Sequence, residues 1–295
     1  MSRILHFPGD ARRISGMSDP ALPPLVPAEG LHVLHLFYDV DAEVWEDLTP
    51  GERSAARDRF RSTISAIRTQ PDTQLLSFAV VGSKADLGFM LVGKDLQTLN
   101  AAEKRLGLSL GPGLLTPVYS YFSMTERSEY TTSEEDYVAK TLQGEKGLQP
   151  DTEEFNDALQ EFRERMDKYG KDRLYPNLAD WPVVCFYNMT KRRVPEQNWY
   201  ALPFEKRKEL MGGHARVGRQ WAGKIRQLIT GSTGLDDEEW GVTLFAKDTY
   251  DVKGIVYQMR FDEVSAVYAD FGPFYIGLQL APDPLIDRVL PDFSA

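Results

Sequence analysis

The chain has four histidines, and the last of them lies in a segment that could hold a cofactor. Around His214 apolar residues recur at steps of three and four, which predicts one face of a helix from Pro203 to about Arg226. That face comprises Leu210, His214, Val217, Trp221, Ile225 and Leu228. Three glycines, each costing about 1 kcal/mol relative to alanine, lie in the same helix at positions 212, 213 and 218. Either they leave a bare surface for a macrocycle beside the imidazole, or His214 is a core histidine in a closely packed helix.

The other histidines do not form a metal cluster with His214. His6 lies in a proline-rich arm, and His32 and His35 have an odd separation on a predicted strand, so they point to opposite faces. The sequence therefore argues against zinc or non-haem iron, which take several protein ligands. Haem iron takes four ligands from its porphyrin, so one axial histidine is sufficient. No Ser/His/Asp order, P-loop or dinucleotide-binding glycine motif has a supporting context, and Gly231-Ser-Thr-Gly234 is predicted to be a tight turn.

Polar residues near this segment could interact with an anionic cofactor. Tyr187 lies on the predicted strand before the His214 helix, where a tyrosine ordinarily packs in the core. Gln227 should begin the following strand and reach a shared cavity from another side, because a continuous helix would place it about 20 Å from His214. Six cations could pair with a tetra-anionic ligand, although alone they are typical of a solvated surface: Arg173, Lys191, Arg192, Arg193, Arg216 and Arg219.

The composition restricts the class of protein. The chain has 295 residues and a net charge of −10, which argues against an extended nucleic-acid or anionic-membrane footprint. Its single cysteine, Cys185, excludes an intrachain disulfide and a cysteine-based zinc site. The N-terminus lacks the apolar core of a signal peptide, and no apolar run approaches the roughly 20 residues of a membrane span. We expect a soluble, cytoplasmic protein.

Periodicity predicts a first half with the order β-α-β-β-α-β over residues 31–125, after an extended or disordered arm at 1–30. Thr49-Pro-Gly-Glu52 has the pattern of a helix start, with proline in the first turn and an acidic residue three positions after the cap. The predicted strands are 31–38, 75–81, 88–92 and 117–124, and the predicted helices are 49–68 and 96–106.

Residues 126–175 are predicted to form a helical linker, and residues 176–295 then repeat the order of the first half. In the linker, Thr132-Ser-Glu-Glu135 is a capping box, and a later apolar stripe (Phe155, Leu159, Phe162, Met166, Tyr169) is predicted to stop at Gly170. In the second half, the predicted strands are 182–189, 228–233, 240–245 and 265–271, and the predicted helices are 203–226 and 250–259.

Gly88–Asp95 and Gly241–Asp248 both read G-x-x-L-x-x-K-D, each running from a strand into a helix. We therefore predict an α+β fold in which two ferredoxin-like halves form a dimeric-α+β-barrel-like subunit, with helices outside the sheets. A cavity between sheet and helix in one half is the natural ligand site.

Several motifs of the second half together resemble those of the coproheme decarboxylases, the haem-synthesising branch of the chlorite dismutase-like superfamily. The match is dense from about 173 to 277 and looser over 31–125. The motifs are Tyr175-Pro, Cys185-Phe-Tyr-Asn-Met-Thr-Lys191, Asn198-Trp-Tyr200, His214-x-x-x-Gly-Arg219, Ala222-Gly-Lys-Ile225, Gln227-x-Ile-Thr-Gly-Ser-Thr-Gly234, Glu239-Trp-Gly-Val-Thr-Leu-Phe245 and Met259-Arg-Phe-Asp-Glu-Val-Ser-Ala266.

The resemblance implies a role for each matching residue. His214 would be the proximal ligand of the iron, Tyr187 the redox-active tyrosine beside the reacting propionate, and Lys191 a polar partner there. Gln227 occupies the distal position, where chlorite-converting members have arginine. Tyr187 also places the chain in the tyrosine branch rather than the histidine branch. Four further residues match positions that line the pocket or hold propionates: Arg173, Met189, Trp199 and Ser265. The chain departs from the pattern at Asn188 and Ala215, where relatives have proline and glycine.

The implied activity is decarboxylation of coproheme (Fe-coproporphyrin III) by hydrogen peroxide, with coproheme as both substrate and redox cofactor. The propionates at positions 2 and 4 become vinyl groups through a tyrosyl radical, and haem b is the product of this last step of a coproporphyrin-dependent haem pathway. The resemblance also implies a homopentamer and transient contact with a coproporphyrin ferrochelatase.

Three alternatives are open. A chlorite dismutase or haem peroxidase is disfavoured by Gln227, and a coproheme or haem carrier without turnover is disfavoured by Tyr187. A scaffold protein without a cofactor would show no Soret absorption after coproheme is added.

Overall fold

The computed structural model describes residues 23–290. The expectations for His6 and for most of the predicted arm lie outside these residues. Residues 23–30 have no regular secondary structure, and they run beside the first turn of a helix. The Leu25 amide donates to the Asp95 carboxylate at 2.7 Å, and the Leu96 amide donates to the Leu25 carbonyl at 3.0 Å. This last part of the predicted arm is therefore bound to the first half.

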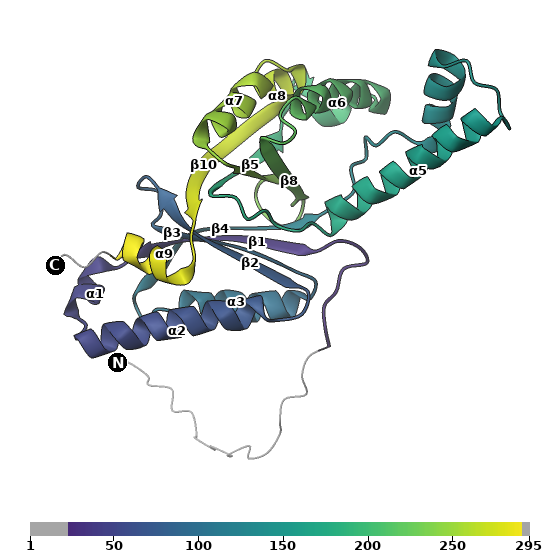
Figure 1. The fold of residues 1–295 in the computed structure, drawn as a ribbon. Coiled ribbons are helices and arrows are strands. Elements are labelled where there is room, and N and C mark those ends of the chain that lie inside the picture. The colour runs from purple at the N-terminus through teal and green to yellow at the C-terminus, as the bar shows by residue number, and fades with distance from the viewer. Residues whose placement is uncertain (1–22, 291–295) are drawn as a thin grey trace, which may run out of the picture.

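Eight antiparallel strands close into a barrel in the order β1-β3-β2-β10-β5-β9-β8-β4 (Figure 1). The strands of the first half are β1 (His32–Val40), β2 (Thr73–Val81), β3 (Leu87–Gly93) and β4 (Leu115–Thr125). Those of the second half are β5 (Val183–Lys191), β8 (Ile225–Gly231), β9 (Trp240–Ala246) and β10 (Ala269–Gln279). The intervening β6 (Arg193–Val194) and β7 (Gln197–Asn198) form a separate small hairpin.

The two halves of the barrel have the same strand order. Each sheet runs fourth, first, third, second strand: β4-β1-β3-β2 in one half and β10-β5-β9-β8 in the other. The sheets join edge to edge where β2 pairs with β10 and β4 pairs with β8. Closure leaves no unpaired sheet edge. The structure confirms the predicted α+β class and barrel. The division into halves at 31–125 and 176–295, with a linker at 126–175, stays a prediction about domain organisation.

Helices cover opposite outer faces of the barrel (Figure 1). The first half has α1 (Ala42–Asp47), α2 (Pro50–Arg68) and α3 (Leu96–Gly107). The second half has η2 (Trp199–Ala201, a 3₁₀ turn), α6 (Phe204–Arg219), α7 (Thr249–Met259) and α8 (Glu263–Tyr268), and α9 (Pro282–Val289) returns to the first half. Between the halves, α4 (Glu134–Asp136), the π-helix η1 (Tyr137–Glu145) and α5 (Glu153–Leu174) project away from the barrel (Figure 1).

Capping residues explain where several helices begin. Thr49 forms the predicted capping box with Glu52, whose carboxylate accepts the Thr49 amide at 2.8 Å. In both copies of G-x-x-L-x-x-K-D the final aspartate is the N-cap of the following helix: Asp95 caps α3 and Asp248 caps α7. The repeated motif therefore encodes a buried strand followed by a helix start.

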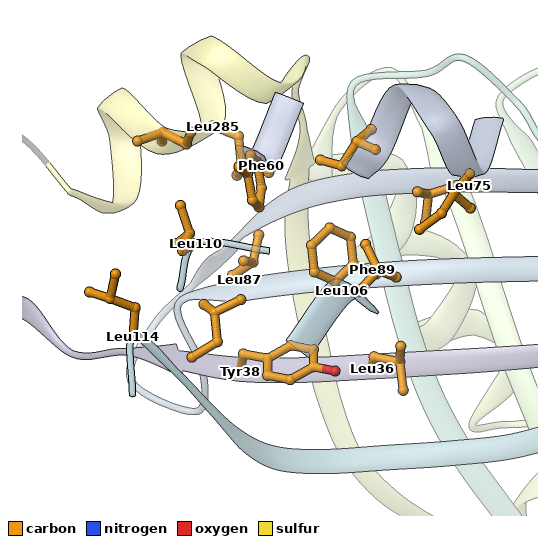
Figure 2. Close-up of a cluster of buried hydrophobic side chains, with 14 of the residues drawn as sticks. Leu36, Tyr38, Phe60, Leu75, Leu87, Phe89, Leu106, Leu110, Leu114 and Leu285 are labelled. Carbon is orange, nitrogen blue, oxygen red and sulfur yellow. The ribbon is translucent and has the colours of Figure 1, made fainter. Parts of the chain in front are cut away.

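The outer face of the first half is filled by apolar side chains. The even-numbered residues of β1, such as Leu36 and Tyr38, meet Phe60 of α2 and Leu106 of α3 in a cluster that Leu285 of α9 completes (Figure 2). Because strand side chains alternate between faces, the odd-numbered residues of β1 point into the barrel. There they join a second cluster that draws on all eight strands of the barrel and includes Val33, Phe37, Met90, Phe186, Leu228 and Tyr275.

His32 and His35 lie on opposite faces of β1, as predicted. His35 is buried inside the barrel, where Nε2 hydrogen-bonds the Thr243 hydroxyl at 2.8 Å. His32 instead contacts the Lys94 carbonyl through Nδ1 at 3.1 Å and stacks on Phe122. Gly231-Ser-Thr-Gly234 begins the connection between β8 and β9, with Gly234 at a φ of +84°.

Several predicted boundaries are wrong. The strand predicted at 228–233 runs from Ile225 to Gly231, and the helix predicted to begin with a capping box at Thr132 is capped by Ser133, which accepts the Asp136 amide at 3.1 Å.

Helix α6 ends at Arg219 rather than near Arg226, because Gly223 has a φ of +83° and the chain turns into β8 at Ile225. Only Leu210, His214 and Val217 of the predicted helical face therefore lie on the helix. Residues 263–268 form α8 rather than the start of a strand, because Asp262 caps them by accepting the Val264 amide at 3.1 Å. Helix α5 continues past Gly170 to Leu174; at Gly170 the missing side chain leaves room for the Arg127 guanidinium.

Within residues 23–290, no helix is both long enough and apolar enough to cross a membrane.

Candidate functional site

A cavity of about 290 Å³ lies between the outer face of the second-half sheet and helices α6, α7 and α8. This volume is of ligand size rather than a packing defect. All eight candidate residues from the sequence line it, although they come from different segments of the chain: Arg173, Tyr187, Met189, Lys191, Trp199, His214, Gln227 and Ser265. The structure thus brings the predicted site residues together, while their roles stay predictions.

The period of two along a strand places the strand residues in the cavity. On β5, Val184 and Phe186 point into the barrel core, so Tyr187, Met189 and Lys191 point outward into the cavity. The same alternation directs Gln227 and Ile229 of β8 outward, as well as Trp240, Val242 and Leu244 of β9. Gln227 therefore approaches from the strand that follows α6, as the sequence predicted.

His214 reaches the cavity from α6, and its ring is held by a carboxylate. Nδ1 lies 2.7 Å from Oδ2 of Asp262. That oxygen also accepts the Ser265 hydroxyl at 2.9 Å, while Oδ1 accepts the Val264 amide. An imidazole whose Nδ1–H is held by a carboxylate presents Nε2 as a lone-pair donor, which is the usual arrangement of a metal-binding histidine.

Asp262 is stabilised as an anion. Burial acts to raise the pKa of this carboxyl, but hydrogen bonds from His214, Ser265 and the Val264 amide outweigh burial and hold the pKa below its ordinary value. Asp262 lies in the last of the motifs that resemble the family, but its role was not predicted from the sequence. The pattern Asp-x-x-Ser at a helix start was the available signal.

Ser265 lines the cavity, and its hydroxyl donates to Asp262, so its observed contact supports the histidine. A role in holding a propionate stays a prediction.

The glycines of α6 do not form a bare surface in the cavity wall, and only Gly218 takes part in close helix packing. None of Gly212, Gly213 and Gly218 lines the cavity. A Cβ at Gly218 would lie 3.3 Å from Cε of Met259 on α7, so this glycine lets the two helices approach.

Tyr187 is a buried phenol. Its ring stacks on Phe274 with centroids 4.4 Å apart and lies 5.9 Å from Phe271. Burial is the main cause that raises the pKa of Tyr187. The side chain is therefore a neutral phenol at pH 7 and can give up a hydrogen atom.

Lys191 is a buried cation on the same face of β5. Its ammonium lies 4.5 Å from the ring centroid of Trp199, which is only 2% exposed. Burial lowers the pKa of Lys191 to about 8, and the carboxylates of Asp262 and Glu239 oppose this shift. A ligand carboxylate would pair with this ammonium and offset the cost of its burial.

Of the six candidate cations, Arg173 and Lys191 line the cavity. Arg173 extends from the last turn of α5, and its Nε donates to the Glu126 carbonyl at 3.1 Å. Arg192 lies instead in an adjoining hollow beside Arg260, where it is paired with Asp270 at 2.8 Å. The remaining three, Arg193, Arg216 and Arg219, do not line the cavity.

The donor set and the walls fit an iron porphyrin that bears carboxylates. One imidazole, apolar side chains from both sheet and helices, and three cations (Arg127, Arg173 and Lys191) meet in one cavity. No cluster of three or more histidine, cysteine, aspartate or glutamate residues that could hold a metal ion is present among residues 23–290.

The chain matches a family model, and it is similar to haem-binding proteins. The model described as Chlorite dismutase matches residues 53–280. A curated protein of Natronomonas pharaonis, named as a heme-binding protein, is 38% identical over 270 residues, which are 90% of this chain and 42% of that protein. The chain thus spans less than half the length of this curated relative.

Two solved structures have the same fold. One, described as a heme-binding protein from Thermus thermophilus, is 35% identical with a TM-score of 0.74, and the match covers 90% of this chain and 97% of the other. The other is a mutant chlorite dismutase from Candidatus Nitrospira defluvii with 15% identity and a TM-score of 0.66, covering 90% and 97%. At that identity the second likeness concerns the fold alone.

The substitution Lys191→Met should stabilise the ligand-free protein at pH 7 by about 3 kcal/mol. The reason is that the buried ammonium has a pKa of about 8, against 10.5 for an ordinary lysine, so keeping it charged in the folded state costs free energy. Between these two pH values the folded chain releases a proton that the unfolded chain still binds. The wild type therefore gains stability as pH rises. Urea unfolding from pH 7 to 10.5 should show the advantage of the variant shrinking towards zero.

The control is Lys224→Met, at a lysine whose side chain is 62% exposed and lies 5.6 Å from the Trp221 ring. Its effect should be small at every pH. A destabilised Lys191→Met protein, or an advantage that does not change with pH, would contradict this account of the buried charge.

Proposed function

This chain belongs to the chlorite dismutase family, and we propose that within it the chain is a coproheme decarboxylase that uses hydrogen peroxide to convert two propionates of Fe-coproporphyrin III to vinyl groups. One observation carries the proposal. A neutral buried phenol, Tyr187, and a buried ammonium, Lys191, lie on the same strand face, in the same cavity as a histidine whose Nδ1 is held by a carboxylate.

The ligand class is supported by the cavity and by the names of two relatives. Both the Natronomonas pharaonis and the Thermus thermophilus proteins are described as heme-binding, and each is at least 35% identical to this chain. Coproheme differs from haem b in carrying four carboxylates rather than two. Arg173 and Lys191 are the cations in the cavity wall that we assign to carboxylates of the substrate.

Each side chain has a distinct role in the proposal. His214 binds the iron of the substrate through Nε2, and Asp262 orients the imidazole and increases its donor strength. When bound, the iron activates hydrogen peroxide and supplies the oxidising equivalents. Tyr187 gives up its hydrogen atom and, as a phenoxyl radical, abstracts a hydrogen atom from the β-carbon of the adjacent propionate. Lys191 pairs with the carboxylate of that propionate and holds it for the abstraction. Met189, Trp199 and Gln227 line the cavity and carry no charge.

The overall reaction balances for each propionate. R–CH2–CH2–COO⁻ becomes R–CH=CH2 and CO2, with loss of a proton and two electrons. The electrons reduce hydrogen peroxide, together with two protons, to two waters. The buried phenol suits this chemistry, because its raised pKa keeps the hydrogen on oxygen until oxidation removes it.

Gln227 separates this proposal from chlorite conversion, for which the family resemblance implies an arginine. Gln227 lines the cavity from β8 and carries no charge to hold a small anion. A peroxidase or a simple carrier would have no use for Tyr187 beside a propionate. We also propose, from the resemblance, a homopentamer that makes transient contact with a coproporphyrin ferrochelatase and, from the sequence, a cytoplasmic location.

Tyr187→Phe should bind coproheme with wild-type affinity and produce no haem b, because phenylalanine keeps the ring that stacks on Phe274 and removes the transferable hydrogen. The measurement is a coproheme titration followed by addition of peroxide and chromatography of the extracted pigment. Tyr268→Phe, at a buried tyrosine that does not line the cavity, is the control and should turn over normally. Wild-type turnover by the Tyr187→Phe protein would show that Tyr187 does not form the reacting radical.

His214→Ala should remove the axial nitrogen and change the Soret spectrum of bound coproheme. Asp262→Asn should retain the histidine but weaken coproheme binding by about 10–100-fold, because the carboxylate that orients the ring is lost. Asp283→Asn, at an aspartate that pairs with Arg61 on the first half, should bind like the wild type. An unchanged spectrum in His214→Ala would assign the iron to another ligand, and wild-type affinity in Asp262→Asn would remove the role given to that carboxylate.

A further inference from the structure

Glu239 is a buried carboxylate that has no role in the proposed reaction. It directly precedes β9, and only 6% of its surface is exposed. Glutamate is seldom buried this far unless partners compensate for its charge. Its contacts therefore indicate what it does.

The inward contacts of Glu239 fix the end of β5. The ladder between β5 and β9 ends where Met189 pairs with Trp240. Beyond that pair the Glu239 side chain takes the place of a backbone acceptor, because its Oε2 accepts the Lys191 amide at 2.8 Å. In addition, the Glu239 amide donates to the Thr190 hydroxyl at 3.3 Å. These contacts hold Lys191, the last residue of β5, on the β9 side, while on the other side Lys191 pairs with Ala269 of β10.

The side chain of Lys191 is held on one side and free on the other. Trp199 lies beneath the ammonium and is itself fixed, since its amide donates to the Arg192 carbonyl at 3.0 Å. Among residues 23–290, no carboxylate oxygen lies within 4.0 Å of the Lys191 ammonium. The ammonium is therefore available to a carboxylate of the ligand.

The outward contacts of Glu239 are with more exposed groups. Nη1 of Arg193, whose side chain is 66% exposed, lies 4.0 Å from Oε1. Burial, followed by the effect of the neighbouring Glu239 carboxylate, raises the pKa of the Tyr200 phenol. The charged and titratable groups that act on Lys191 and Glu239 are then Asp262 before α8, Arg193 of β6 and Tyr200 of η2.

We propose that Glu239 is a positioning residue that holds the end of β5 through the Lys191 amide and so directs the Lys191 ammonium into the cavity, where it can pair with a carboxylate at the edge of a bound porphyrin. The inference rests on the proposed function for the class of ligand. It assigns to Glu239 a charge effect in addition to its hydrogen bonds.

The physical reason is the balance between burial and neighbouring charge. Burial favours loss of the Lys191 proton, and only the carboxylates of Asp262 and Glu239 oppose it. Removing one of two nearby opposite charges lowers the pKa of such an ammonium by about one to two pH units. A deprotonated lysine cannot form an ion pair with a carboxylate, so ligand affinity falls where Lys191 loses its proton.

The test uses metal-free coproporphyrin III, which cannot bind iron through His214 and does not turn over. Its binding to the wild type, followed by porphyrin fluorescence from pH 6 to 9, should weaken above about pH 8, where Lys191 loses its proton. In Glu239→Gln this weakening should begin about one to two pH units lower. Glutamine still offers an oxygen to the Lys191 amide, so the variant removes the charge and keeps the hydrogen bond.

Two variants complete the design. Glu238→Gln removes the same charge from the neighbouring position and should keep the wild-type profile. Lys191→Met should bind weakly at every pH and show no weakening near pH 8. A Glu239→Gln profile that superimposes on the wild type would overturn the inference, and so would an equal loss of affinity at every pH, which indicates a structural role alone.

The outcome is separable from that of the proposed function. If the wild type binds the porphyrin and Glu239→Gln has the same pH profile, the inference is wrong, and the proposed decarboxylation is unaffected. The shift without decarboxylation of the iron form defeats the function and leaves the inference. A wild type that does not bind the porphyrin overturns both.

Discussion

The alternation of side chains along β5 is the constraint on which both the barrel and the cavity depend. Val184 and Phe186 point inward and join the core shared by all eight strands of the barrel, so the strand cannot rotate or slip by one residue without exposing them. The outward direction of Tyr187, Met189 and Lys191 is fixed by the same core. Core packing thus fixes the direction of the side chains to which we assign the reaction, and it does so more precisely than a loop would.

The two halves share one strand order but use their outer faces differently. In the first half, α2 and α3 press Phe60, Ile64 and Leu106 onto the sheet, and these side chains fill the space completely. In the second half, α6 contributes a partly exposed histidine, and the space between helix and sheet stays open as a cavity. The first half packs helices directly against the sheet, whereas the second half keeps a cavity there, which we propose as the binding site.

Local patterns in the sequence predict much of this architecture. The repeated G-x-x-L-x-x-K-D works as a signal because Asp95 and Asp248 cap helices that follow buried strands, and both features are local. The eight candidate residues were predicted from motif resemblance rather than from periodicity, because they come from segments far apart in the chain. Contacts such as His214 with Asp262, 48 residues apart, have no periodic signal, so Asp262 and Glu239 were missed. The α8 error has a local cause instead: Asp262 caps residues 263–268 by accepting the Val264 amide, and the strand prediction overlooked this helix start.

The most direct measurement is a mass spectrum of the porphyrin after the pure protein, ferric coproheme and stoichiometric hydrogen peroxide are mixed. The proposed function, in which Tyr187 and Lys191 lie at a propionate of the substrate, predicts sequential loss of two carboxyl groups, with haem b as the end point. Coproheme that binds and stays intact while peroxide is consumed would contradict the account and leave a carrier or a peroxidase.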